Sequence, residues 1–96
     1  MANAAHVAAA EKLVSVIEAE WHSDLKGAPE WFRLEGERVL DNAKALLESI
    51  RSGRVIEVLK GGSIHEYLGG GWMDTHGKAY DQMEQLESLL AGRHAT

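Results

Sequence analysis

Residues 29–53 read PEWFRLEGERVLDNAKALLESIRSG, and this stretch decides the fold class that the sequence predicts. Its apolar positions recur at alternating intervals of four and three residues, which places them on one face of an α-helix: Phe32, Gly36, Val39, Ala43, Leu46 and Ile50. Trp31, Leu40 and Leu47 flank this face. Proline suits a first helical turn because its missing N–H has no partner there, and Ser52-Gly53 is a typical helix end. One long amphipathic helix is therefore expected.

Gly36 is the unusual member of this apolar face. Glycine inside a helix costs about 1 kcal/mol of helix propensity relative to alanine. A compensating reason is a close approach of another part of the chain at that point. The sequence therefore predicts a tight helix crossing at Gly36.

A second long helix is predicted before this one, from a cap at Asn3 to about Leu25. Its apolar residues follow the same alternating spacing: Val7, Ala10, Val14, Ile17 and Trp21. Gly27 lies where a helix would stop, and the connection to Pro29 is short. Short connections join antiparallel neighbours, so we expect the two long helices to form a hairpin.

The middle of the chain is less regular. Residues 54–60 suit either a short helix or a strand, and we favour a helix because an isolated strand has nothing to pair with. Ser63 and Glu66 have the spacing of a capping box, which predicts a short helix over residues 64–68. The three glycines 69–71 are expected to end that helix.

A last helix is predicted to begin after a cap at Asp74 or Thr75 and to run to about Leu90. Trp72-Met73 is then an apolar pair within the preceding loop. The expected fold is all-α, as a single helical domain over residues 1–96. It is a small helical bundle of two long antiparallel helices, one or two short helices and a C-terminal helix.

Composition excludes several classes of function. The chain has 96 residues and no cysteine, which excludes disulfides, a thiolate nucleophile and a cysteine-based zinc site. Its net charge of −5 disfavours binding to nucleic acid or to anionic membranes. The first residues do not resemble a signal peptide, and no apolar run is long enough to span a bilayer. The absence of cysteine fits a reducing compartment, so a cytoplasmic location is expected.

Four residues around the triple glycine are the candidates for a binding surface: His65, Trp72, Asp74 and His76. With His65 nearby, Asp74 and His76 could supply a three-ligand metal site, but surface exposure and helix capping explain these residues more simply. Trp72 is either a plug in the core or an anchor for a partner, and the plug is favoured because tryptophan is usually well buried. No catalytic residue, metal ligand or cofactor is assigned. The sequence has no H-E-x-x-H zinc-binding motif, no P-loop and no G-x-S-x-G nucleophile elbow.

The leading functional hypothesis is a small acidic, non-enzymatic protein-interaction module, such as an inhibitor, an immunity-type protein or an adaptor. Its partner would be another protein or a second copy of the chain, as a homodimer, if the amphipathic faces are not fully covered. The alternative is a small-ligand or metal-binding helical domain, with its site around the predicted loop from Gly69 to His76. An enzyme is the least supported class.

Overall fold

The computed structural model describes residues 3–54, 59 and 62–91, and no strand occurs in this part of the chain. Its helices are α1 (Ala4–Asp24), α2 (Glu30–Arg51), α4 (Ile64–Leu68), α5 (Gly70–Asp74) and α6 (Gly77–Leu90). The predicted all-α fold is confirmed. The helix expected over residues 54–60 lies largely outside the described residues.

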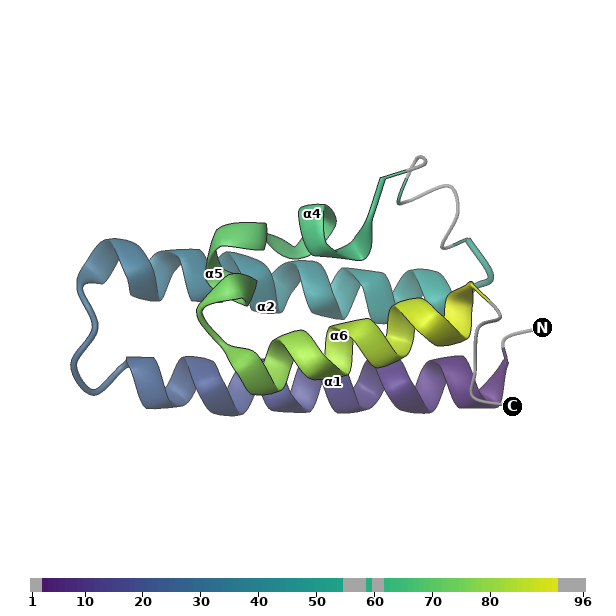
Figure 1. Ribbon diagram of the computed structural model, residues 1–96, viewed down its shortest axis with the longest axis horizontal. Helices are drawn as coiled ribbons and strands as arrows, with labels where there is room; N and C mark the ends of the chain where they lie inside the picture. Colours follow the sequence, from purple (N-terminus) through teal and green to yellow (C-terminus); the bar gives the residue numbers. More distant parts are fainter. Residues whose placement is uncertain (1–2, 55–58, 60–61, 92–96) are drawn as a thin grey trace.

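Helices α1 and α2 form the predicted antiparallel hairpin, joined by residues 25–29 (Figure 1). The predicted cap at Asn3 is confirmed, because its side-chain Oδ1 accepts from the backbone N–H groups of Ala5 (2.8 Å) and His6 (3.3 Å). Pro29 occupies the N-cap position of α2, and Gly53 follows the helix with a φ of 73°. At the hairpin connection, the first helix was predicted to end at about Leu25 and the second to begin at Pro29. Both lie within one residue of the observed bounds, Asp24 and Glu30.

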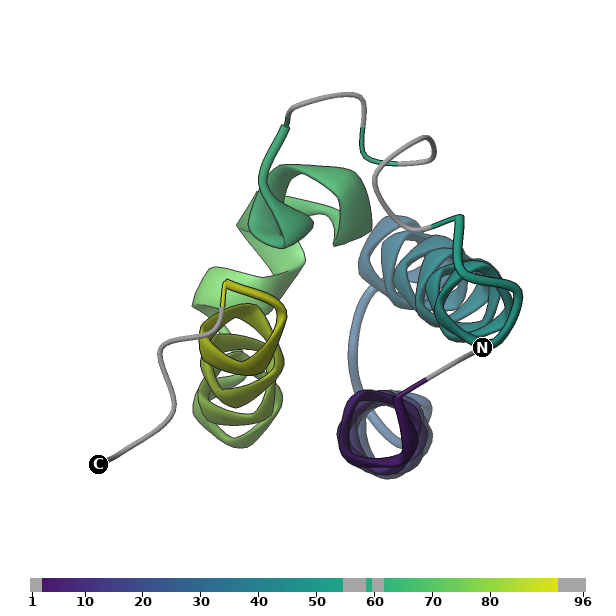
Figure 2. The ribbon, with the colours of Figure 1, turned by 90° about the vertical axis from the view of Figure 1, so that its right-hand side faces the viewer.

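The shorter helices cover the apolar side of the hairpin. Figure 2 views the bundle end-on: α6 runs beside α1, whereas α4 and α5 pack on α2. All the helices contribute to one core, whose largest fully buried side chains are Leu13, Ile17, Val39, Leu46, Leu68, Trp72, Met73, Met83 and Leu86. Trp72 has no exposed surface, so the core interpretation of this residue is confirmed.

Two aromatic rings pack closely against α2 at Gly36. A Cβ at this position would lie 2.7 Å from Cδ1 of Trp21 in α1 and 2.8 Å from Nε1 of Trp72 in α5. The close contact expected at Gly36 is present, but indole rings from two helices make it, and not the backbone of a crossing helix. Glycine is required here because no methyl group fits between them and α2.

The segment after α4 differs from the sequence prediction. The triple glycine and Trp72-Met73 were expected in a loop, but only Gly69, with a φ of 128°, interrupts the helices. Gly70 already begins α5, and Trp72 and Met73 lie on that helix with no exposed surface. Burial of these two large side chains outweighs the poor helix propensity of the glycines before them.

The predicted caps of the last helix are wrong. Neither Asp74 nor Thr75 caps α6, since the N-cap position belongs to His76, which makes no side-chain cap bond. The Thr75 hydroxyl donates instead to the carbonyl of Trp72 (2.8 Å), and the Asp74 carboxylate pairs with a histidine of α4. Both side chains thus serve the end of α5.

The capping box at α4 is partly confirmed. Ser63 Oγ accepts from the backbone N–H of Glu66 (3.1 Å), as predicted. The Glu66 carboxylate accepts from the Ser63 hydroxyl (3.3 Å) and not from the Ser63 backbone N–H. One of the two reciprocal bonds is therefore sufficient to begin this short helix at Ile64.

Within the described residues, the structure contains no helix with both the length and the apolar character needed to cross a bilayer.

Replacing Gly36 with alanine should destabilise the protein even though alanine is the better helix former. Overpacking against the buried Trp72 indole and the partly buried Trp21 indole costs about 1–3 kcal/mol, against a helix-propensity gain of about 1 kcal/mol. We expect a net loss of up to about 2 kcal/mol in the free energy of unfolding, measured by urea denaturation. Gly77→Ala is the matched control, because a Cβ there meets nothing within 4 Å. Equal effects of the two substitutions would contradict the tight contact at Gly36.

Candidate functional site

The four residues nominated from the sequence separate into two pairs. At the surface, His65 Nε2 lies 2.8 Å from Asp74 Oδ1, and the two side chains are 33% and 59% exposed. The His65 ring packs on Gly70, where a Cβ would come within 2.6 Å of its Cε1, and against the edge of Tyr80. This pair fastens the end of α5 to α4.

His76 and Trp72 form the second pair, inside the core. Their rings stack with centroids 3.7 Å apart and planes inclined by 14°. Phe32 stacks near the same imidazole, with centroids 5.6 Å apart. His76 Nε2–H donates to Asp24 Oδ2 (2.9 Å), and Nδ1 lies 2.8 Å from the carbonyl oxygen of Trp72. His76 therefore links the C-terminal end of α1 to α5 and α2.

This separation leaves the three-ligand metal site that was considered as an alternative without support. Both ring nitrogens of His76 have partners in the fold, and Trp72 is enclosed by the core. In the ranges 3–54 and 62–91, and at residue 59, no group of three or more His, Cys, Asp or Glu side chains is placed to hold a metal ion. His65 and Asp74 remain as an isolated exposed pair.

The N···O distances of the His65–Asp74 and His76–Asp24 pairs are nearly equal, at 2.8 and 2.9 Å, but only the second pair is well buried. This difference in burial should determine how much each pair contributes to the free energy of unfolding. Asp24→Ala leaves the Nε2–H of a histidine that is 8% exposed without its acceptor, so we expect a loss of about 1–3 kcal/mol in unfolding free energy. Asp74→Ala removes the exposed pair and should cost less than about 1 kcal/mol. Each aspartate is the last residue of its helix, so both substitutions remove a carboxylate from a helix C-terminus. Thermal and urea denaturation at neutral pH compare them, and an equal or larger effect at Asp74 would contradict this assignment.

An exposed apolar surface lies at the end of the molecule where α1 and α2 are joined. It consists of Leu25, Trp31 and Leu34, which are 39%, 66% and 57% exposed. We call these three residues the hairpin-end surface. Among the described residues they are the large apolar side chains that the fold leaves in water, whereas Trp72 and the other core residues are enclosed.

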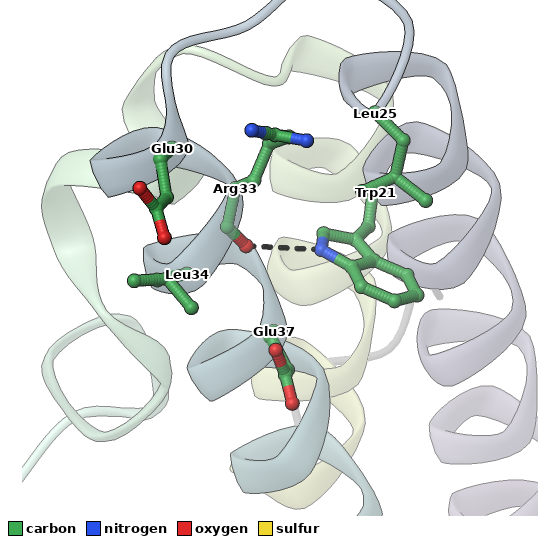
Figure 3. Close-up of a pocket in the computed structure, with 6 residues that line it drawn as sticks. All are labelled: Trp21, Leu25, Glu30, Arg33, Leu34 and Glu37. Atoms are coloured by element: carbon green, nitrogen blue, oxygen red, sulfur yellow. Dashed lines mark hydrogen bonds between the residues drawn. The ribbon is translucent and has the colours of Figure 1, made fainter.

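Two hollows adjoin this surface, and Leu34 contributes to both. The first, of about 220 Å³, lies between the C-terminal end of α1 and the start of α2 (Figure 3), and its lining residues are Trp21, Leu25, Glu30, Arg33, Leu34 and Glu37. The Trp21 indole N–H donates to the carbonyl of Arg33 (3.0 Å), which fixes the ring at its inner side. The second hollow, of about 380 Å³, is lined by Trp31, Leu34, Glu35, Arg38, Val39, Leu68 and Gly69.

Charged side chains of both signs surround the hairpin-end surface. Within the described part of the chain, none of them forms a salt bridge: Glu30, Arg33, Glu35, Glu37 and Arg38. Their sum is close to neutral, in contrast to the net charge of −5 of the whole chain. The surface thus combines an apolar centre with a ring of charges that have no partner in the fold.

The hairpin-end surface was not predicted from the sequence, because the spacing of apolar residues was used only to identify the inner, core-facing side of α2. Trp31 was assigned only as a flank of that face. Leu34 is two residues from both Phe32 and Gly36, which at about 100° per residue places it on the opposite side of the helix. A leucine directly opposite the buried face was the signal that could have revealed it.

Comparison of the chain with protein-family models, with curated proteins and with solved structures gives no match. A function for this chain therefore has to be inferred from the geometry of the surface itself.

Proposed function

We propose that this protein is a non-enzymatic protein-interaction module that binds through the hairpin-end surface. The observation that carries the proposal is the exposure of Trp31 (66%) beside Leu34 (57%), whereas the large apolar residues elsewhere in the described part of the chain are buried or partly buried, apart from Leu25 (39%). Contiguous exposed apolar residues with a polar rim are typical of association sites. Tryptophan is also among the residues that contribute most to binding energy in protein interfaces.

The surroundings of this surface favour a protein as the ligand. An apolar centre with a rim of mixed charges has the composition of a protein interface, whereas a nucleic-acid site needs an excess of positive charge. The two hollows, of about 220 and 380 Å³, lie below and near the lower end of the usual range for small-molecule sites. They suit the side chains of a docked partner better than a buried ligand. An inhibitor, an immunity-type protein or an adaptor in the cytoplasm would fit such a surface.

The alternative of a small-ligand or metal-binding domain around residues 69–76 gains no support from the contacts there. Its aromatic and imidazole groups, Trp72 and His76, are packed against each other in the core. We therefore place the function at the other face of α2.

The proposal is tested with Trp31→Ser and Leu34→Ser as separate variants. Because both side chains are mostly exposed, each change should alter the unfolding free energy by no more than about 0.5 kcal/mol. The wild type and the variants are immobilised and incubated with a lysate of the source organism, and retained proteins are identified by mass spectrometry. We expect the specific partner, or the chain itself, to be retained by the wild type and lost from both variants.

Ala45→Ser is the matched control, because Ala45 is exposed on α2 about three turns beyond Leu34. It should retain what the wild type retains. Equal retention by wild type, Trp31→Ser and Leu34→Ser would overturn the proposal, as would a wild type that neither retains a protein nor self-associates.

A further inference from the structure

His76 is enclosed in the core, and both of its ring nitrogens lie against oxygen atoms. Its side chain is 8% exposed, and Nε2 lies 2.9 Å from Oδ2 of Asp24 at the end of α1. Nδ1 lies 2.8 Å from the backbone carbonyl oxygen of Trp72. A carboxylate and a carbonyl only accept hydrogen bonds, so the ring donates to both of them only when both nitrogens carry a proton. That form of the ring is the positively charged imidazolium.

The Thr75 hydroxyl is placed to respond to this proton. Its Oγ1 lies 2.8 Å from the Trp72 carbonyl oxygen and 2.9 Å from His76 Nδ1. When Nδ1 is protonated, the hydroxyl and Nδ1–H both donate to the carbonyl. When Nδ1 has lost its proton it becomes an acceptor, and the hydroxyl can turn to donate to it. The unshared electron pairs of Nδ1 and of the Trp72 carbonyl oxygen then face each other at 2.8 Å, which weakens this contact.

Aromatic rings beside the imidazole also favour its charged form. The Trp72 indole stacks on it with centroids 3.7 Å apart, and the Phe32 ring stacks with centroids 5.6 Å apart. A cation over the face of an aromatic ring is attracted to it, most strongly over tryptophan. Burial alone would favour the neutral imidazole. The Asp24 carboxylate offsets this effect, because it contacts the ring and stays 18% exposed to water.

In the described part of the chain, Asp24 is the charged group that contacts this imidazole. On α2, Arg33 lines the hollow of Figure 3, and Glu35 lies against the start of α5. Asp74 of α5 pairs with a histidine of α4, and Lys78 at the start of α6 is exposed. The positive charge on the imidazole is therefore balanced by the carboxylate of α1.

We propose that His76 is a pH-sensitive tie in this fold. Its protonated ring joins the end of α1 to α5, and loss of the proton weakens the contact with the Trp72 carbonyl. Histidine is the side chain whose charge ordinarily changes between about pH 5 and pH 8. The folded chain holds the extra proton in a hydrogen bond that the unfolded chain lacks, so protonation stabilises the fold. The free energy of unfolding contributed by this tie is therefore present at about pH 5 and is lost as the pH rises toward about 8.

The first test compares the pH dependence of unfolding in the wild type and in His76→Gln. Urea denaturation of each protein is measured in steps from about pH 5 to about pH 8. Glutamine can still donate to Asp24, but its charge does not change in this range. Across the range, the ratio of folded to unfolded wild type should fall about fivefold to tenfold more than that of His76→Gln, as expected for one hydrogen bond. Equal pH dependence in the two proteins would overturn the proposal.

Thr75→Val distinguishes a proton-dependent tie from an ordinary packing contact. Thr75 is exposed, and valine keeps the shape of its side chain without the hydroxyl. The neutral Nδ1 of His76 then has no donor, so loss of the proton should be more costly and the pH dependence steeper than in the wild type. If His76 only filled space, this substitution would leave the pH dependence unchanged. An unchanged or weaker pH dependence in Thr75→Val contradicts the proposal.

The protonation of the ring is observed directly in the wild type, which keeps the proposal testable even if His76→Gln does not fold. Long-range ¹⁵N–¹H correlation spectra show which nitrogen of an imidazole carries a proton. Both nitrogens of His76 should be protonated at about pH 5, and the proton that is lost toward about pH 8 should be that of Nδ1. A neutral ring with its proton on Nδ1, or a ring already neutral at about pH 5, would rule out the tie.

His65→Gln is the matched control, because it removes the histidine of the other Asp–His pair, which is exposed. This variant should keep most of the pH dependence of the wild type, since exposed ion pairs contribute little to stability. A larger loss of pH dependence in His65→Gln than in His76→Gln would place the pH sensitivity at the exposed pair and overturn its assignment to His76.

Discussion

The packing of two indole rings against Gly36 is the constraint on which the rest of the structure depends. Trp21 from α1 and Trp72 from α5 both reach the backbone of α2 at this residue. Through this contact α1 packs on α2 at Gly36, and α5 packs on α2 at the same residue. Trp72 in turn stacks on His76, which binds Asp24 at the end of α1. Because Gly36 has no side chain, it allows contacts between segments that are far apart in the sequence.

The same helix has two different roles on its two faces. The inner face of α2 supplies the largest share of the core, including Val39, Ala43 and Leu46. The outer face near its N-terminal end carries Leu34 and Trp31, which contribute little to stability because they stay in water. Exposed apolar residues lower solubility without adding stability, and binding of a partner is the simplest explanation for them. The unpaired charges around them would favour one orientation of that partner.

Much of the fold could be predicted from local chemistry. Asn3, Pro29 and Ser63 mark helix starts because capping depends on neighbouring residues alone, and the spacing of apolar residues indicated both long helices. Gly36 revealed a close contact, although not its partners. The glycines before Trp72 led to a wrong prediction of a loop, because burial of Trp72 and Met73 against other helices stabilises α5.

The candidate site was harder to predict, for physical reasons. The Asp24–His76 bond joins residues 52 positions apart, so no local pattern indicates that His76 is a core residue. Leu34 was visible in the helical spacing, but only its exposure in the folded chain shows that no other described element covers it.

Trp31 is the tryptophan that we expect to meet a partner, whereas Trp21 and Trp72 belong to the fold. Each indole N–H gives its own signal in a ¹⁵N–¹H correlation spectrum, so the three can be followed together as the partner retained by the wild type, or unlabelled chain, is added. We expect the Trp31 signal to shift on this addition while those of Trp21 and Trp72 stay in place. Shifts at Trp21 or Trp72 with an unchanged Trp31 would contradict this division of roles.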